Sequence, residues 1–335
     1  MKREGNLFHR IVDYDNLYLA YKKARKGKAW QNTIKHFEKD VGGNLKRIQE
    51  SLLNGSFTTS KYRTMQVYEP KQRTIYILPF NPDRIVQHAI MNVTEPIWDR
   101  RFIHDSYSCR KGKGQHKGSR RCMEFVRRYR YCLKGDISKF YPSINHDIMF
   151  GLVKRTIKCP GTLWLLKNII YAIGGGRNIP IGNYTSQWLG NLYLHELDKY
   201  CKHDLSIKSY IRYCDDFVLF HNDKKYLHYC LKGIQNLLSC RLDLSMSKDS
   251  IFPVTQGVDF LGYRHFPNYV LLRKSTAKRV KKRLTKLPTR LHKKLITKKQ
   301  YLSSIQSTKG WVKWCNSYNF TIHNQINNLL NEVTK

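Results

Sequence analysis

The chain has 335 residues, 41% of them hydrophobic and 13% aromatic, which is enough apolar material for a large core and excludes a disordered basic tail. Its 61 Lys and Arg against 24 Asp and Glu leave a net charge of +37, which calls for a polyanionic partner and favours nucleic acid. Nine scattered cysteines without a Cys-x-x-Cys pair exclude zinc-finger spacing and a disulfide scaffold, and they predict reduced, mostly buried thiols in a cytoplasmic protein.

The first part of the chain predicts helices followed by a hairpin. The charged N-terminus lacks the apolar region of a signal peptide, and the most apolar stretch, 163–173, is too short for a membrane span. Residues 6–55 have helical periodicity and end at Asn54-Gly55, a pair typical of a helix C-terminus. Residues 62–79 alternate apolar and polar side chains around Glu69-Pro70-Lys71, which predicts a hairpin.

The rest of the chain mixes strands and helices without regular β-α alternation, which favours an α+β fold. The predicted elements are, in chain order, a helix at 83–98, a basic glycine-rich loop at 106–121, a buried strand within 131–144, a loop and helix at 178–201, a hairpin at 210–220, a helix near 225–240 and a strand at 257–266. Residues 273–299 contain thirteen Lys and Arg and no acid. Helical spacing there predicts a basic amphipathic helix, mildly interrupted at Pro288, with Leu284, Leu287, Leu291 and Leu295 on one face.

Two adjacent carboxylates, Asp215 and Asp216, stand inside the apolar hairpin YIRYCDDFVLF. Burying two like charges is unfavourable unless a cation neutralises them. A predicted strand that ends at Asp136 would add a third carboxylate, and hard oxygen ligands of this kind select Mg²⁺. Two such ions can hold the attacking and leaving oxygens of a phosphoryl transfer. The alternative is a solvated turn with two exposed aspartates.

The order of these motifs resembles the reverse transcriptases. In that family D-x-x-x-x-F/Y, here Asp136 to Tyr141, precedes Y-x-D-D, here 213–216. Four more segments resemble family motifs in the same order, namely 73–90, 106–118, 242–254 and 258–266. The resemblance implies a right-hand α+β polymerase with an antiparallel sheet plus helices in its palm. We expect an N-terminal helical extension at 1–61, fingers and palm at 62–266, and a short, basic helical thumb at 267–335.

The resemblance also implies roles for single residues. Asp136, Asp215 and Asp216 are expected to be catalytic and, with the Ile137 carbonyl, to bind two Mg²⁺ ions, for which Mn²⁺ can substitute. The expected nucleotide-binding residues are Arg73, Lys71, Tyr141, Ile181, Gly182, Gln187 and Lys248. The expected primer grip is Phe260, Leu261, Gly262 and Tyr263, and the expected contacts to the nucleic-acid backbone are Arg110, Lys113, Lys278, Lys281, Lys282 and Arg283. Taken alone, Lys71 reads better as a solvated cation, and Tyr141 reads equally well as a core aromatic or as a gate against the ribose 2′-hydroxyl.

One loop indicates which class of reverse transcriptases the chain resembles most. Most reverse transcriptases read P-Q-G and then S-P before the palm helix, whereas this chain has Pro180-Ile181-Gly182 and then Ser186-Gln187. The stretch IGNYTSQ resembles the enzymes of diversity-generating retroelements. That resemblance implies error-prone, adenine-mutagenic cDNA synthesis from a template-repeat RNA for mutagenic retrohoming. The implied partners are dNTPs, an RNA–DNA hybrid and a basic pentameric accessory variability protein, with no membrane, in a bacterial or phage-infected bacterial cell.

Alternatives remain open at this stage. A retron-type or other bacterial reverse transcriptase, for example one acting in phage defence, fits the general motifs, although the retron V-T-G-L segment is not present cleanly at 254–263. Group II intron enzymes generally keep P-Q-G and are longer. A non-catalytic RNA-binding protein is a further alternative, against which the three intact aspartates argue. Ile181 predicts low fidelity, and the competing reading is that it is a neutral packing choice.

Overall fold

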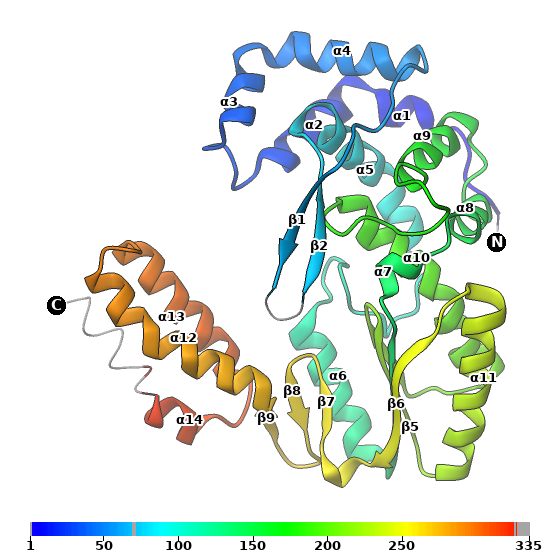
Figure 1. Ribbon diagram of the computed structural model, residues 1–335. Helices are drawn as coiled ribbons and strands as arrows, with labels where there is room; N and C mark the ends of the chain where they lie inside the picture. Colours follow the sequence, from blue (N-terminus) through cyan, green and yellow to red (C-terminus); the bar gives the residue numbers. More distant parts are fainter. Residues whose placement is uncertain (1, 69–71, 325, 327–335) are drawn as a thin grey trace.

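The computed structural model describes residues 2–68, 72–324 and 326 of the chain. The N-terminal segment forms four α-helices at one end of the molecule (Figure 1). These are α1 (Phe8–Val12), α2 (Tyr14–Arg25), α3 (Asn32–Phe37) and α4 (Val41–Leu53), with a 3-10 turn at Glu38–Asp40. The Asp13 carboxylate caps α2, and Asn54 is the C-cap residue of α4, followed by Gly55 at φ +68°, as the Asn-Gly pair predicts.

A two-stranded hairpin extends away from these helices. It consists of β1 (Arg63–Val67) and β2 (Arg73–Ile77), which pair in antiparallel register, and the predicted turn residues Glu69 to Lys71 lie outside the described residues. After a short π-helical turn at Phe80–Arg84 the chain enters α5 (Ile85–Asp99). This helix is almost entirely buried and packs between α2 and α10 (Tyr184–Lys199).

The central sheet has four antiparallel strands in the order β4-β5-β3-β6. Their bounds are β3 (Tyr131–Ile137), β4 (Tyr210–Tyr213), β5 (Asp216–His221) and β6 (Met246–Pro253). Both faces are covered. Leu133, Phe217 and Leu219 belong to the main core with α10 and α11 (Lys224–Leu242), whereas Cys132 and Val218 pack on α6 (Gln115–Arg128). Because both faces are apolar, these strands appear as nearly continuous apolar runs in the sequence.

The segment between β3 and α10, which the sequence pattern left unassigned, is helical. It contains α7 (Phe140–Ser143), α8 (His146–Lys154) and α9 (Pro160–Ile170). The basic loop predicted at 106–121 is shorter than expected, since α6 begins at Gln115. All nine cysteines, each within the described part of the chain, are free thiols, as predicted, and five of them are buried. In the same described ranges no helix has both the length and the hydropathy needed to cross a membrane.

The C-terminal part begins with a second small sheet. The predicted strand at 257–266 is in fact a tight hairpin, β7 (Val258–Phe260) and β8 (Tyr263–His265), joined to the edge strand β9 (Val270–Leu272). The prediction of one strand was wrong because Leu261 and Gly262 both have positive φ, which reverses the chain. The helices that follow are α12 (Lys274–His292), α13 (Lys298–Val312) and α14 (Tyr318–His323).

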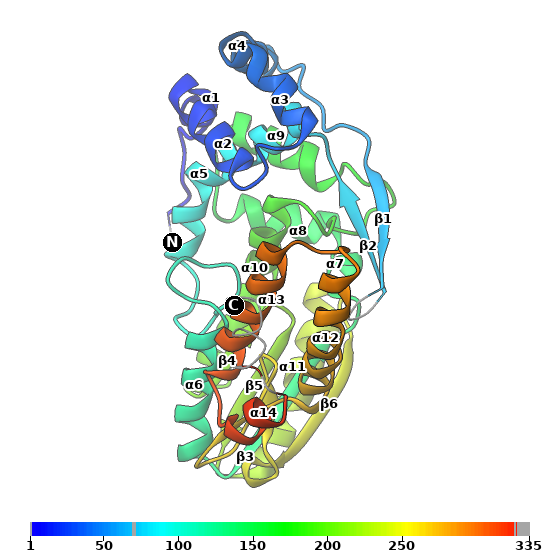
Figure 2. The ribbon, with the colours of Figure 1, turned by 90° about the vertical axis from the view of Figure 1, so that its left-hand side faces the viewer.

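Helix α12 passes through Pro288 without the predicted interruption. Leu284 and Leu287 are buried against Tyr301 and Ile305 of α13, and this burial offsets the hydrogen bond that proline removes from the helix. Leu295, predicted on the same face, lies beyond the helix and is exposed. The α12–α13 pair has a small core of its own and stands beside the central sheet, across from the β1–β2 hairpin (Figures 1 and 2).

Candidate functional site

The three aspartates come together at one end of the central sheet. Strand β4 ends at Tyr213 and β5 begins at Asp216, so Cys214 and Asp215 form the two-residue turn between them. Across the sheet, Asp136 at the end of β3 is the register partner of Asp216 on one side and of Lys248 on the other. The fold therefore brings together carboxylates that are far apart in the sequence.

Each carboxylate has a different environment. Asp136 Oδ2 accepts a hydrogen bond from Ser247 Oγ at 2.8 Å. Asp216 Oδ1 lies 3.7 Å from Lys134 Nζ, which is too long for a hydrogen bond. Burial raises the pKa of Asp216 to about 7, against the lowering effect of Lys134, and burial also raises the pKa of Asp215. The raised pKa values mean that the surroundings of Asp215 and Asp216 supply too little positive charge to offset the burial of two ionised carboxylates.

These residues fit a divalent cation in chemistry but are not arranged as a finished cluster. In the described residues no group of three or more His, Cys, Asp and Glu side chains lies close enough to hold a metal ion. Asp216 Oδ1, however, is buried and accepts no hydrogen bond. The atoms that could bind a metal ion here are all oxygens, as Mg²⁺ prefers. A β-bulge between Asp136 and Ile137 interrupts the ladder beside the carbonyl that was expected to be a further ligand.

The loop before α10 is fixed against the β1–β2 hairpin. The Tyr76 N–H donates to the Ile181 carbonyl at 2.8 Å, and Ser186 Oγ donates to the Pro180 carbonyl at 2.7 Å. Gly182 has φ +125°, and a Cβ there would collide with the Tyr76 carbonyl, so glycine is required. Ile181 is half-buried at this junction.

The other expected nucleotide-binding residues differ in how close they lie to the aspartates. The Tyr141 hydroxyl is 3.6 Å from Cys214 Sγ, beside the aspartate turn, and its ring packs on Gly190. Lys248 is exposed next to Asp136 on β6. Gln187 is exposed on the first turn of α10, and Lys71 lies outside the described residues.

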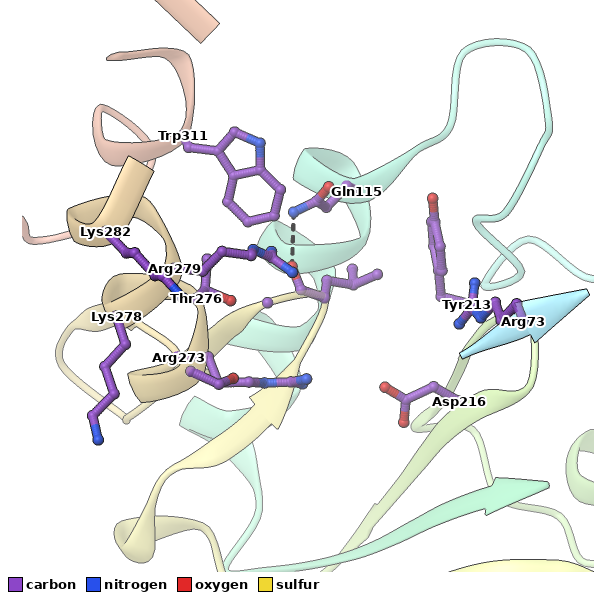
Figure 3. A pocket seen from close by; sticks show the side chains of 13 residues that line it. Arg73, Gln115, Tyr213, Asp216, Arg273, Thr276, Lys278, Arg279, Lys282 and Trp311 are labelled. Carbon is purple, nitrogen blue, oxygen red and sulfur yellow. Dashed lines mark hydrogen bonds between the residues drawn. The ribbon is translucent and has the colours of Figure 1, made fainter. Parts of the chain in front are cut away.

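A basic cleft of about 760 Å³ opens between Asp216 and α12. Figure 3 shows Arg273 extending from the start of α12 toward Asp216, with Arg73 and Tyr213 beyond it. The cationic residues that line the cleft are Arg73, Arg273, Lys278, Arg279 and Lys282. Such a concentration of positive charge beside carboxylates suits a polyphosphate or a nucleic-acid backbone. The phosphates would lie between the cationic side chains and the carboxylates.

Several expected contact residues are buried or already bonded within the protein. The Arg110 side chain is 7% exposed and binds the Asp99 carboxylate and three main-chain carbonyls, so its guanidinium is already bonded within the protein. Lys113 is half-buried and donates to the His104 carbonyl at 2.7 Å. Of the primer-grip set, Phe260 and Tyr263 are fully buried, which leaves Leu261 and Gly262 on the cleft.

The expected contact residues on helix α12 also differ in whether they line the cleft. Lys278 and Lys282 line the cleft, whereas Lys281 is exposed but does not line it. Arg283 donates to Thr308 of α13 and lines a neighbouring groove instead.

Sequence reasoning missed several cleft residues. Gln115 donates to the Leu261 carbonyl at 2.7 Å, and Trp311 packs on Gly262. No local pattern pointed to either one. Lys134, which lies beside Asp216 but does not line the cleft, was also missed, although it stands two residues before Asp136 on a strand and therefore on the same face. Arg273 and Arg279 belonged to the basic run that was recognised but not resolved residue by residue.

Comparison with known proteins gives a family for this arrangement. The family model described as reverse transcriptase (RNA-dependent DNA polymerase) matches residues 68–265, which is more than half of the chain and includes all three aspartates. The chain is similar to protein YkfC of Escherichia coli (strain K12), with 29% identity over 273 residues that cover 66% of this chain and 70% of YkfC. It is also similar to the group II intron-encoded protein LtrA of Lactococcus lactis, with 26% identity over 67% of this chain.

The matched region covers 39% of LtrA, so the chain spans about two fifths of that relative's length. A shorter match, 23% identical over 116 residues, is to the mitochondrial nuclear intron maturase 1 of Arabidopsis thaliana. The fold is α+β, with mixed helices and antiparallel sheets, as the resemblance implied. On the extent of the family match, the chain belongs to the reverse transcriptase family.

Proposed function

We propose that the chain copies an RNA template into DNA, with its chemistry at Asp136, Asp215 and Asp216. The observation that carries the proposal is the position of these carboxylates, which meet at one end of the central sheet, where Asp216 lines a cleft that also carries five cationic residues. In this assignment the fingers and palm occupy 62–266, the thumb 267–335 and a helical extension 1–61. The thumb and fingers then enclose the template–primer duplex beside the aspartates.

In this proposal each side chain at the site has its own role. Asp136 and Asp215, with the Ile137 carbonyl, would hold two Mg²⁺ ions, and Asp216, which lies 3.7 Å from Lys134 Nζ, would support them. When bound, the ions lower the pKa of the attacking hydroxyl and stabilise charge on the leaving oxygen. Arg73 and Lys248 neutralise the triphosphate of the incoming dNTP. Tyr141 excludes the ribose 2′-hydroxyl, and Lys278 and Lys282 bind the duplex backbone.

Within the family we assign the chain to the diversity-generating class, which makes adenine-mutagenic cDNA from a template-repeat RNA. The support is the IGNYTSQ loop, in which Ile181 replaces the usual glutamine and is held against the fingers by the Tyr76 N–H. A half-buried isoleucine there offers bulk but no hydrogen bond to the incoming nucleotide. The proposed partner is a small basic pentameric accessory protein. A retron-type enzyme is the alternative.

The experiment is extension of a DNA primer on an RNA template with all four dNTPs and Mg²⁺, followed by sequencing of the product. We expect cDNA with errors concentrated opposite template adenines, and no product when EDTA removes the divalent ions. A chain that retains RNA but adds no nucleotide would be a binding protein. Extension with equal error at all four template bases would support a general reverse transcriptase and contradict the mutagenic class.

A further inference from the structure

Arg212 is a fully buried cation on β4, three residues before Asp215. Its guanidinium makes a two-pronged ion pair with Asp198 of α10, from Nε to Oδ1 and from Nη2 to Oδ2, both at 2.6 Å. Neither side chain is exposed to solvent. Burial alone would raise the pKa of Asp198, but Arg212 outweighs it and the pKa is lowered to about 2. The pair is therefore ionised and anchors Arg212 rigidly to α10.

The remaining guanidinium protons are also used. Nη1 donates to the Cys214 carbonyl at 2.9 Å and to Asn191 Oδ1 at 3.2 Å, and Nη2 donates to Ser106 Oγ at 3.3 Å. All five N–H donors thus have acceptors. One of these acceptors, the Cys214 carbonyl, belongs to the two-residue turn that carries Asp215.

This turn has an unusual backbone. Cys214 has φ +58°, in the left-handed region that glycine adopts freely and other residues rarely adopt. Such a conformation is unfavourable for a residue with a side chain and persists where surrounding contacts fix it. The Tyr213–Asp216 pairing closes the hairpin and the Tyr141 hydroxyl lies 3.6 Å from the Cys214 side chain, whereas the Arg212 bond to the Cys214 carbonyl holds the main chain of the turn.

We propose that Arg212 is a positioning residue that fixes the Cys214–Asp215 turn and so aims the Asp215 carboxylate at the reacting atoms. The inference rests on the proposed polymerase function. Arg212 does not reach the substrate, since it is buried beneath the turn and acts through one carbonyl. Lysine cannot replace it, because a single ammonium group on a flexible stem cannot bind both Asp198 oxygens and the Cys214 carbonyl.

The test compares Arg212→Lys with Tyr210→Phe in the full chain. Tyr210 is equally buried and donates to the same carboxylate, Asp198 Oδ1, at 2.8 Å, but it has no contact with the turn. We expect Arg212→Lys to lower kcat for nucleotide addition about 100-fold with a nearly unchanged KM for dNTP, as a misplaced catalytic group does. Mn²⁺ binding without substrate, followed by electron paramagnetic resonance, should weaken about tenfold. Tyr210→Phe should leave both quantities within about threefold of the unmodified chain.

A variant that removes both charges keeps the test valid if Arg212→Lys does not fold. The double substitution Arg212→Met with Asp198→Leu leaves no unpaired buried charge, and exchanges of this kind are often neutral for stability. It should show the same loss of kcat and of Mn²⁺ affinity. An unmodified chain that does not extend a primer would refute the proposed function itself. An active chain whose Arg212 variants keep kcat and Mn²⁺ affinity, or whose Tyr210→Phe variant loses them equally, would refute the positioning role alone.

Discussion

Asp136 on β3 and Asp216 on β5 are direct register partners at the end of the central sheet. The pairing of the two strands fixes this relationship, so it does not depend on a flexible loop. The neighbouring cation Lys134 lies 3.7 Å from the Asp216 carboxylate and donates to the Asp259 carbonyl at 2.5 Å. The sheet therefore holds two carboxylates together while a lysine neutralises part of their charge, and divalent ions would neutralise more.

The basic face of α12 gives a prediction with a control on the same helix. Lys282 lines the cleft, and Lys281 beside it does not. Lys282→Ala should weaken binding of an RNA–DNA duplex and make the plot of log K against log salt concentration shallower by about one. Lys281→Ala should change the slope much less. Equal slopes in fluorescence titrations of the two variants would show that α12 does not bind the backbone through its cleft face.

Tyr141 gives a prediction about sugar selection. Its ring packs on Gly190 and its hydroxyl lies against Cys214 of the aspartate turn. Tyr141→Ala should lower the preference for dNTP over rNTP by about 10- to 100-fold, because the space next to the sugar opens. Tyr141→Phe keeps the ring and should keep the preference. Single-nucleotide incorporation kinetics measure both, and an unchanged preference in Tyr141→Ala would make the residue a core aromatic.

Ile181 gives a prediction about fidelity. A glutamine there would offer polar groups that a mispaired nucleotide leaves unsatisfied, whereas isoleucine tolerates a misfit for about 1–3 kcal/mol. Ile181→Gln should therefore lower misincorporation opposite template adenine about tenfold. Ile181→Leu keeps an apolar side chain and should keep the parent error rate. If sequenced cDNA has the same adenine errors in all three enzymes, infidelity arises in the RNA or in a partner.

A buried histidine gives a prediction about acid stability. His265 donates from Nδ1 to the Val258 carbonyl at 3.1 Å, so its Nε2 accepts from Ser119 Oγ at 2.8 Å. Burial lowers the pKa of His265 from 6.5 to about 4. The unfolded chain therefore takes up a proton below pH 6.5, whereas the folded chain does so only near pH 4. The contribution of His265 to stability is complete above pH 6.5 and decreases as the pH falls from 6.5 to 4.

The matched variant is His265→Gln, which does not titrate. The unfolding free energy of the unmodified chain should fall by about 3 kcal/mol more than that of the variant between pH 6.5 and 4. His88, whose pKa is also lowered to about 4, is present in both proteins and cancels in the comparison. Denaturant titrations at several pH values measure this difference. Parallel pH profiles would mean that His265 is protonated without cost.

Much of the fold could be predicted from the sequence where the signal was local. The hairpin at 210–220 was bounded by its apolar run, and the C-terminus of α4 was marked by Asn54-Gly55. The α9 segment was noticed as apolar but not assigned, because a short apolar run fits either a strand or a helix. The turn at Leu261-Gly262 was missed because leucine rarely takes positive φ.

In the candidate site, too, residues with a local sequence signal could be predicted, and residues placed by distant contacts could not. Residue type and spacing were enough to predict that Asp136, Asp215 and Asp216 lie together, because a motif keeps both in its linear sequence, and their catalytic role stays a prediction. The burial of Arg110 and the position of Trp311 depend on partners that are distant in the sequence, Asp99 and Gly262, and no periodicity encodes such contacts. Charge alone could not separate Lys282 from Lys281, since only the packing of α12 decides which one faces the cleft.

The most direct test of the central claim is primer extension on RNA by Asp215→Asn, with Asp249→Asn as the control. Asp249 is an exposed aspartate on the same sheet, on β6. Asp215→Asn should lower the extension rate at least about 1,000-fold while affinity for the RNA–DNA duplex stays within about threefold, because it removes a proposed metal ligand and no proposed backbone contact. Asp249→Asn should extend at the parent rate. Near-normal extension by Asp215→Asn in Mg²⁺ would contradict the assignment of this turn as the polymerase centre.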